Sequence, residues 1–420
     1  MKGDTIMAKP LENVKVLDLT QFLSGSYATM LLGGLGAEII KAERPGAGDP
    51  ARASSPFAGP NGVSTKRQTP NDMSLGALKR LRNKKSVSLN LQNEDGRKVF
   101  LDLVSKVDIV IENYKYGTLD KMGLTYEKMK EINPAIVYAS VSGFGEVEAY
   151  KKLPAFDIVV QAMSGLMNIN GSDDMPPLKV GMAIGDEPAG MFAAIGVLAA
   201  YIHAKETGIG ARVTVSMLES IMSMIMDEAH DFNLSQGRTA RNGNSLPRLT
   251  PFNCYKCKDG HFVVATGGSD KMWADMLEIM GRQDLLEDER YCKLPGRVQR
   301  TSEVDAIIED WAKDVTVDEA VALIAAKRIP VGPVKTVQQA WTDPNLIEAN
   351  AIVPVVHPDC GEISGVKAAQ NPIRIHGDDV ENVYLNQPAP TVGQHNEEIY
   401  KHLLGYSAEK IEALKQAEAI

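Results

Sequence analysis

The sequence contains few cysteines and no long hydrophobic run. Its 420 residues include four cysteines (Cys254, Cys257, Cys292 and Cys360), too few to cross-link a chain of this length, so we expect a reducing compartment. The first ten residues are polar, and the longest apolar run, 191–201, is shorter than the roughly 20 residues that span a membrane. We therefore expect a cytoplasmic protein.

Positive charge is also scarce. Lys and Arg number 45 against 54 Asp and Glu, which gives a formal net charge of -9. Such a chain has no general basic field, so nucleic-acid and membrane partners are not expected and a polyanionic ligand needs a local basic patch. With 44% hydrophobic and 24% charged residues, the composition is that of a soluble globular protein. The length predicts two or three domains.

The common catalytic and metal-binding motifs are missing. The seven histidines are scattered, and the chain has neither H-E-x-x-H nor G-x-S-x-G. Cys254 and Cys257 form an isolated C-x-x-C in a strand-like run, where nothing completes a zinc or redox centre. The glycines at 33–36 follow the first predicted strand by about a helix, which is too late for a dinucleotide-binding turn, so we interpret them as helix packing or a C-cap. We expect no metal and no tightly bound cofactor.

A repeated strand–helix rhythm occupies the first 140 residues. Segments 94–105 and 126–132 carry apolar residues at helical spacing. The predicted strands around them lie at 14–19, 37–43, 86–91, 107–112 and 135–141. This alternation predicts an α/β fold with a Rossmann-like parallel sheet covered by helices on both faces.

The remainder of the chain predicts a second, smaller domain. A strand at 212–215 lies between helical segments at 189–205 and 216–234, and the polar stretch 235–250 has no periodicity, as is typical of a linker. The predicted parts are a large Rossmann-like domain at 1–220 completed by 345–420, a helix and linker at 221–250, a small α+β domain at 251–330 and a return linker at 331–344.

Two aspartates are candidates for chemistry. Asp186 follows Gly185 just ahead of an apolar segment that begins near Pro188, and taken alone it is most simply a helix N-cap. The functional alternative is a nucleophile, because a carboxylate beside a glycine is sterically open and the amides at a helix start stabilise negative charge. Asp157 opens another predicted helix and is a candidate to assist. The residues alone do not decide whether Asp186 is an N-cap or a nucleophile.

Eight segments, taken in order, carry a family resemblance. They are 16–52 (which begins VLDLTQFLSGSYAT), 83–91, 108–124, 133–145, 156–167, 185–200 (GDEPAGMFAAIGVLAA), 329–334 and 343–353. Their order and spacing resemble the class III CoA-transferases (the CaiB/BaiF family), which include formyl-CoA transferase and the carnitine and aryl-lactate CoA-transferases. The resemblance covers nearly the whole chain.

The resemblance implies a reaction and a catalytic residue. In that family the aspartate that matches Asp186 attacks an acyl-CoA thioester, so here Asp186 is expected to be the nucleophile rather than only an N-cap. The implied enzyme moves CoA from an acyl-CoA thioester to an acceptor carboxylic acid through aspartyl anhydride and aspartyl-CoA thioester intermediates. Asp157 matches an acidic position near the family's active site and is expected to support it. Family members are interlocked homodimers, which the resemblance implies here too.

The family's CoA-binding positions carry over to specific residues. They are Arg44, Leu89, Asn90, Leu91, Gln92, Glu112, Asn113, Tyr114 and Lys121. Relatives often hold an arginine where this chain has Lys121, so a cation is retained but a fork-shaped phosphate contact is lost. We expect Lys84, Lys85 and Arg44 to supply the local positive charge that a CoA phosphate needs.

The substrate pocket is expected to involve Leu23, Ser24, Gly185 and Gly243. Formyl-CoA transferase has a glutamine at the position of Leu23, so the resemblance argues against formyl-CoA and oxalate as the natural pair. The segment 241–245 is the nearest candidate for the glycine-rich loop that lies near the active site of that enzyme. These departures favour a larger or less polar acyl group.

Three other functions remain as alternatives. The α-methylacyl-CoA racemases share the fold, but they need a histidine directly before the residue that matches Asp157, and this chain has Phe156 there. A CoA-binding protein without catalysis is the second alternative, and retention of Asp186 argues against it. An NAD-dependent oxidoreductase is the third, and the missing dinucleotide fingerprint makes it remote.

Overall fold

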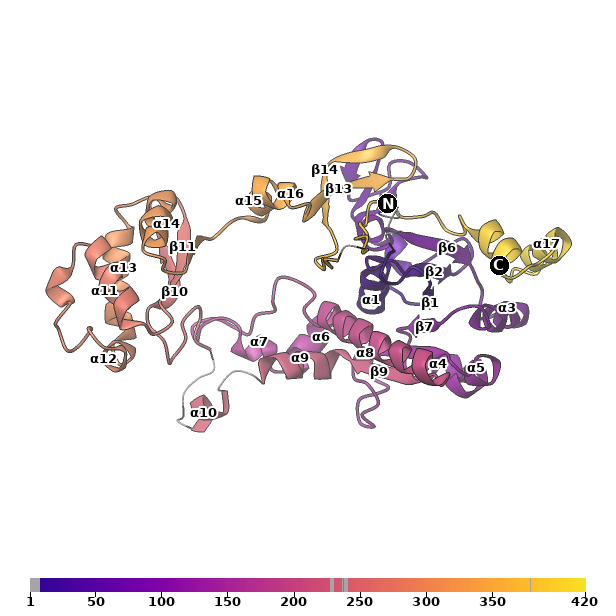
Figure 1. Ribbon diagram of the computed structural model, residues 1–420, viewed down its shortest axis with the longest axis horizontal. Coiled ribbons are helices and arrows are strands. Elements are labelled where there is room, and N and C mark those ends of the chain that lie inside the picture. Colours follow the sequence, from indigo (N-terminus) through magenta and orange to yellow (C-terminus); the bar gives the residue numbers. More distant parts are fainter. Residues whose placement is uncertain (1–7, 227–229, 236, 238–240, 378) are drawn as a thin grey trace, which may run out of the picture. The chain divides into compact units, whose positions relative to one another are not determined.

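The computed structural model describes residues 8–226, 230–235, 237, 241–377 and 379–420 (Figure 1). The chain forms two compact units. The first is made of Met1–Leu166, Val180–Glu228 and Pro344–Ile420, and the second of Met167–Lys179 and Ala229–Asp343. The domain boundaries predicted from the sequence stay a prediction, because compactness alone does not show which segments fold independently.

A six-stranded parallel sheet forms the centre of the first unit. Its strands, in spatial order, are β6 (Lys84–Ser88), β2 (Glu38–Glu43), β1 (Lys15–Asp18), β7 (Ile109–Glu112), β8 (Val137–Ser142) and β9 (Arg212–Ser216). Along the chain this is the order 3-2-1-4-5-6 of the doubly wound fold, so the predicted parallel α/β sheet is confirmed. The order reverses between β1 and β7, where the carboxyl ends of parallel strands leave a crevice suited to ligands.

Helices cover both faces of this sheet (Figure 1). On one face α1 (Ser24–Gly33) and α8 (Asp186–Thr207) pack against strand residues such as Ile39, Ile111 and Val137. On the other face α3 (Glu94–Val104), α5 (Tyr126–Ile132) and the carboxyl-terminal helix α17 (Ala408–Gln416) share a second core. The helices expected at 94–105 and 126–132 are therefore confirmed.

Helices α1 and α8 approach each other closely because small residues meet between them. A Cβ at Gly190 would lie 2.6 Å from the carbonyl oxygen of Ser24, and Ala189 and Ala193 are fully buried on the same side. By length and composition α8 resembles a membrane span, but this packed side marks a core helix. Large side chains on its other side, among them Ile195 and Ile202, are exposed.

Two small sheets in the first unit were not expected from the sequence. One joins β4 (Gly62–Ser64), β3 (Phe57–Gly59) and β5 (Met73–Ser74), and the other joins β13 (Ile352–His357) to β14 (Gly361–Ala369). They share one apolar cluster with α2 (Leu75–Arg80). The segment after Pro344 thus packs on this unit and helps to hold α2.

The second unit has its own core. An antiparallel sheet of β10 (Phe252–Lys256), β11 (His261–Ala265) and β12 (Val331–Pro333) shares a core with α11 (Asp270–Ile279), α13 (Thr301–Ala312) and α14 (Val317–Ala326). A short helix, α12 (Leu294–Val298), precedes α13.

Two predictions about local structure concern residues 216–257. The helix expected at 216–234 is described as α9 (Met217–Ile225) and α10 (His230–Ser235), and residues 227–229 lie outside the description. Cys254 and Cys257 lie in and directly after β10, where burial raises the pKa of both thiols, so neither is an activated nucleophile.

Candidate active site

A cavity of about 1010 Å³ opens at the carboxyl ends of β1, β7 and β8, and Asp186 lies in its wall. Asp186 is the first residue of α8, and the N-cap position before it is occupied by Gly185. The N-cap interpretation of Asp186 is therefore wrong. The carboxylate lines the cavity instead, beside the positive end of the 22-residue helix.

The environment of Asp186 makes its carboxylate unusually basic. Burial raises its pKa to about 6 from 3.8, and the negative charge of Asp157 acts in the same direction. The charge of Arg80 and a hydrogen bond from the Ser24 hydroxyl lower the pKa but do not offset the burial. The group is ionised at neutral pH and is a better nucleophile than an exposed aspartate.

Asp157 holds the residue that precedes Asp186. It opens α6 (Asp157–Met163), and its Oδ1 accepts a hydrogen bond of 2.6 Å from the backbone N–H of Gly185. Its Oδ2 accepts another, also of 2.6 Å, from the side chain of Gln161. A Cβ at Gly185 would lie 3.0 Å from Oδ1, so this approach favours glycine. Both oxygens of Asp157 are thus engaged in positioning the start of α8.

The loop between β1 and α1 forms another wall of the cavity and is held at three consecutive amides. The N–H of Thr20 donates to Asp18 Oδ1 (2.8 Å). The N–H of Gln21 donates to Asn113 Oδ1 (2.7 Å), and that of Phe22 donates to Asp49 Oδ1 (3.1 Å). Phe22 has a φ of +58°, which is uncommon for a residue other than glycine. The hydrogen bonds stabilise this loop conformation.

A buried ionic network lies behind that loop. Lys41 forms ion pairs with Asp18 (3.6 Å) and Asp49 (3.1 Å), and Lys84 pairs with Asp18 at 3.0 Å. Burial acts to raise the pKa of Asp18, but the two ammonium groups hold it well below its usual range. Lys85 pairs at the surface with two glutamates. The prediction that Lys84 and Lys85 supply positive charge to a phosphate is therefore wrong, because both are neutralised within the protein.

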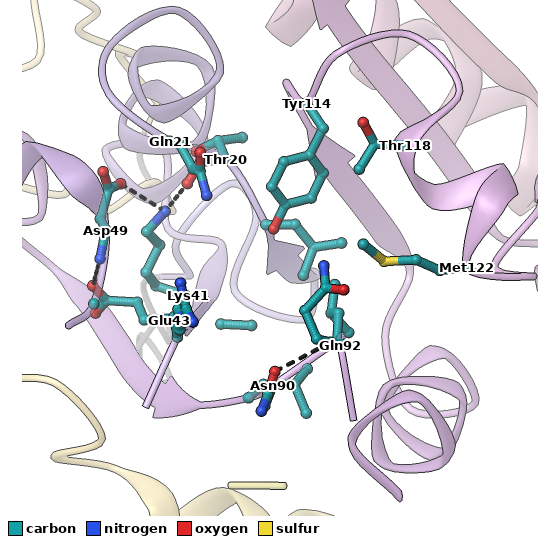
Figure 2. A pocket seen from close by; sticks show the side chains of 16 residues that line it. Thr20, Gln21, Lys41, Glu43, Asp49, Asn90, Gln92, Tyr114, Thr118 and Met122 are labelled. Atoms are coloured by element: carbon teal, nitrogen blue, oxygen red, sulfur yellow. Dashed lines mark hydrogen bonds and ion pairs between the residues drawn. The ribbon is translucent and has the colours of Figure 1, made fainter. Parts of the chain in front are cut away.

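Figure 2 shows the lining of a second cavity, of about 250 Å³. Its lining includes six of the predicted CoA-binding residues, namely Arg44, Leu89, Asn90, Leu91, Gln92 and Tyr114. In Figure 2 Lys41 and Asp49 lie to one side of it and Tyr114 and Thr118 to the other. The two cavities share Gln21, Tyr114 and Thr118 as lining residues, so they are neighbours.

The structure places the other predicted residues in several locations. Leu23, Ser24, Asn113 and Lys121 line the larger cavity. Glu112 is buried at the end of β7, where its carboxylate accepts hydrogen bonds from the Tyr114 N–H and the Tyr138 hydroxyl, and burial raises its pKa. Its carboxylate thus faces the protein interior.

Gly243 belongs to the second unit. Its N–H donates to the carbonyl of Gly171, and Arg241 donates to the carbonyl of Ser172. The segment 241–245 is thereby fixed within that unit, and its role as a cover for the site stays a prediction.

Several residues of the larger cavity were missed from the sequence. Arg80, Lys115, Lys151 and Lys152 line it together with Lys121, which makes it locally basic in an acidic protein. The doublet at 151–152 follows β8, and proximity to the carboxyl end of a strand could have identified it. Arg80 could not be distinguished from its basic neighbours without the fold.

An aromatic pair was missed as well. Phe22 and Phe156 meet edge to face, with ring centroids 6.4 Å apart, and both line the larger cavity. Phe156 is 68% exposed, which is high for a phenyl ring. The cavity therefore has an apolar side as well as a basic one.

Comparison with known proteins agrees with this geometry. The model of CoA-transferase family III matches residues 11–396. The chain is 31% identical to the succinyl-CoA–D-citramalate CoA-transferase of Chloroflexus aurantiacus, over 98% of both chains. It is 33% identical to the formyl-CoA:oxalate CoA-transferase of Streptomyces coelicolor, over 98% of this chain and 100% of the relative.

A solved structure gives the same result. A CaiB/BaiF family protein of Brucella suis superposes with a TM-score of 0.79 at 29% identity, covering 94% of this chain and 99% of that one. The chain belongs to CoA-transferase family III. It is an enzyme that transfers coenzyme A, which confirms the class predicted from the sequence motifs.

Proposed function

We propose that this enzyme moves CoA from an acyl-CoA thioester to an acceptor carboxylic acid, with Asp186 as the nucleophile. In the first step a carboxylate oxygen of Asp186 attacks the thioester carbonyl. The C–S bond breaks, a mixed anhydride forms and CoA leaves as the thiolate. The thiolate then attacks the aspartyl carbonyl of the anhydride, the donor acid leaves as a carboxylate and an aspartyl-CoA thioester remains.

The second half repeats these steps in reverse with the acceptor. The acceptor carboxylate attacks the aspartyl carbonyl and releases the CoA thiolate, which gives a second anhydride. The thiolate attacks the acceptor's acyl carbon, and Asp186 leaves as a carboxylate. No proton is gained or lost overall, and no cofactor is used besides the CoA of the substrate. Each step is effectively unimolecular while the parts stay bound.

The observation that carries this proposal is the position of Asp186. Its half-buried carboxylate, with a pKa raised to about 6, faces a cavity that neighbours the one lined by Arg44 and Asn90. A thioester whose nucleotide end lies near Arg44 has its sulfur end directed towards Asp186. The mechanism requires that water be kept from the anhydrides, because both are readily hydrolysed.

The lining of the larger cavity supports a dicarboxylic acid with a carbon skeleton longer than that of oxalate. Lys115 and Lys152 are exposed cations in the lining that can pair with a distal carboxylate. Phe22 and Phe156 provide an apolar surface for the skeleton. Succinyl-CoA and D-citramalate, in the name of the Chloroflexus relative, belong to this class of substrate. A panel of acyl-CoAs against mono- and dicarboxylic acids, read by mass spectrometry of the CoA esters, tests this specificity.

Racemisation is disfavoured by the same cavity. Proton exchange at an acyl α-carbon needs an acid and a base on opposite faces of that carbon. The position that requires a histidine is Phe156, and no histidine is among the described residues that line the cavity. Exchange of the α-proton of a 2-methylacyl-CoA without an acceptor acid would contradict the transferase mechanism.

We also propose that the enzyme works as a homodimer. The exposed side of α8 carries Met191, Phe192, Ile195 and Ile202, an apolar stripe longer than soluble monomers usually expose. A second copy of the chain is the partner that the family resemblance implies. Such a dimer would cover the helix that begins at the nucleophile.

Chemical trapping tests the nucleophile directly. The enzyme is incubated with an acyl-CoA, quenched with hydroxylamine and digested, and the peptides are analysed by mass spectrometry. We expect a hydroxamate on Asp186 and an unmodified Glu187 in the same peptide, so the neighbouring carboxylate is an internal control. An Asp186→Ala variant that exchanges CoA esters at the wild-type rate would overturn the proposal.

A further inference from the structure

The side-chain amide of Asn113 is held in one orientation by the backbone of Gln21. The N–H of Gln21 donates to Oδ1 (2.7 Å), and Nδ2 donates to the carbonyl of the same residue (2.8 Å). Because a backbone N–H only donates and a carbonyl only accepts, this pair identifies which end of the amide is oxygen and which is nitrogen. Asn113 is predicted to contact CoA, but its hydrogen bonds stay within the protein.

The second proton of Nδ2 determines the direction of the Ser24 hydroxyl. Nδ2 donates to Ser24 Oγ at 3.1 Å, so Oγ is an acceptor there and its own proton points elsewhere. Ser24 begins α1 and lines the same cavity as Asp186. Its hydroxyl acts to lower the pKa of the Asp186 carboxylate, which is the effect of a donor directed at that group. The close packing of Gly190 on the Ser24 carbonyl fixes the start of α1 against the first turn of α8.

We propose that Ser24 is a positioning residue for Asp186, and that Asn113 acts through it by directing the Ser24 proton towards the Asp186 carboxylate. The inference rests on the proposed role of Asp186 as nucleophile. One carboxylate oxygen is held by the Ser24 hydroxyl, and the other is left to attack the thioester. The hydrogen bonds that Asp18 and Asp49 accept from the loop amides keep Ser24 in place during the reaction.

A Ser24→Ala variant tests the hydroxyl. Removal of a donor to the carboxylate disfavours its charged form, so the acid limb of the kcat/KM profile should move up by about one pH unit, a tenfold change in proton affinity. The pH dependence of hydroxylamine trapping at Asp186 should move by the same amount. Ser24→Thr, which keeps the hydroxyl, should restore the wild-type limb. A limb that stays at the wild-type pH in Ser24→Ala would overturn the proposal.

A double-mutant cycle tests the role of Asn113. Asn113→Asp offers only acceptors, so the Ser24 proton should turn towards position 113 and the acid limb should rise. The added charge raises the limb as well, but that contribution persists when Ser24 is alanine. We therefore expect a larger shift from Asn113→Asp in the Ser24 background than in the Ser24→Ala background. Equal shifts in the two backgrounds would show that Asn113 does not act through Ser24.

Two controls separate this inference from the proposed function. Ser105→Ala removes an exposed hydroxyl that donates to a backbone carbonyl at the end of α3, away from both cavities, and should leave the profile unchanged. If wild-type enzyme gives no adduct at Asp186, the proposed function fails. If wild type gives the adduct and Ser24→Ala gives it with the same pH dependence, only the inference about Ser24 fails.

Discussion

The charged form of Asp186 is needed for its proposed catalytic role, but it lowers the free energy of unfolding. Its folded-state pKa is raised from 3.8 to about 6, so the unfolded chain loses this proton at lower pH than the folded protein does. Between about pH 4 and 6 the folded state binds more protons, and the free energy of unfolding falls as pH rises. At neutral pH the charged carboxylate therefore destabilises the fold, although the charge is what its proposed role as the nucleophile requires.

Replacement of Asp186 by asparagine should separate the two effects. We expect Asp186→Asn to lower transfer activity by at least about a thousandfold. The same change should raise the free energy of unfolding at neutral pH by about 2 kcal/mol. Urea unfolding at several pH values, followed by circular dichroism, measures the second effect. A variant less stable than wild type at neutral pH would contradict the assigned pKa shift.

Arg44 is the cation best placed to bind a phosphate of CoA in the smaller cavity. It is exposed, and it forms no ion pair within the described part of the chain. We expect Arg44→Ala to raise the KM for acyl-CoA by about tenfold with little change in kcat, because a contact far from the sulfur contributes equally to substrate and transition state. Arg44→Lys should recover only part of the loss. A change confined to kcat would show that Arg44 acts on the reacting atoms instead.

The site could be predicted at the level of single residues only where the chain itself carried the information. Asp186 was identified because it follows a glycine at the start of an apolar helix within a family motif. Lys84 was misassigned because its sequence neighbours are basic, whereas its ion pair with Asp18 arises from the pairing of non-adjacent strands. Arg80 and Lys152 come from distant segments, and only the complete fold brings both to the lining of the larger cavity.

At the scale of elements, the contact between α1 and α8 places the start of α1, at Ser24, near Asp186. A Gly190→Ala change would place a methyl group 2.6 Å from the Ser24 carbonyl oxygen and 3.1 Å from the Tyr27 ring, so one helix has to move. We expect a loss of about 1–3 kcal/mol in the free energy of unfolding, together with reduced kcat. Chemical denaturation and steady-state kinetics measure the two effects.

Gly332→Ala is the matched control for that substitution. An added Cβ at Gly332 meets no atom within 4 Å, so its effect on stability should be small. Equal stability of the Gly190→Ala variant and wild type would show that the two helices are less tightly packed than described.

Helices were predicted more accurately than strands, for a physical reason. The segment 94–105 became α3 because Asn93 caps its first turn through bonds to the Asp95 and Gly96 amides and its apolar residues face one side. Strands β3 and β5 have only three and two residues, too few for an alternating pattern. Their pairing depends on packing against β13 and β14, which come from a distant part of the chain.

At the scale of the whole molecule, the apolar stripe of α8 predicts self-association. Ile195 and Ile202 are 62% and 57% exposed, and they lie on the side of the helix away from the sheet. We expect wild type to be a dimer by light scattering at low micromolar concentration, and Ile195→Glu to weaken the dimer because it buries an unpaired charge. The same change at Val63, an exposed residue of β4, should leave the dimer intact. A wild-type monomer would contradict the proposed assembly.

The fold class was predictable from the strand–helix rhythm, but the composition of the site was not. The order of the six strands brings Gln21, Asn113 and Ser142 to one edge of the sheet, although the chain separates them widely. Local patterns indicate that strands exist, whereas their spatial order determines which loops meet. The resemblance to a family predicted the parallel sheet without giving its strand order, and the structure and the comparisons confirm the fold class.

The residues shared by the two cavities have a consequence for turnover. Gln21, Tyr114 and Thr118 border both cavities. The nucleotide of CoA can therefore stay bound in the smaller cavity while the donor acid leaves, and the acceptor acid enters, through the larger cavity. In the proposed mechanism, the CoA that is released between the two half-reactions would then not exchange with free CoA in solution. Isotopically labelled free CoA added during catalysis should stay out of the product thioester, and its appearance there would mean that the bound CoA escapes at every cycle.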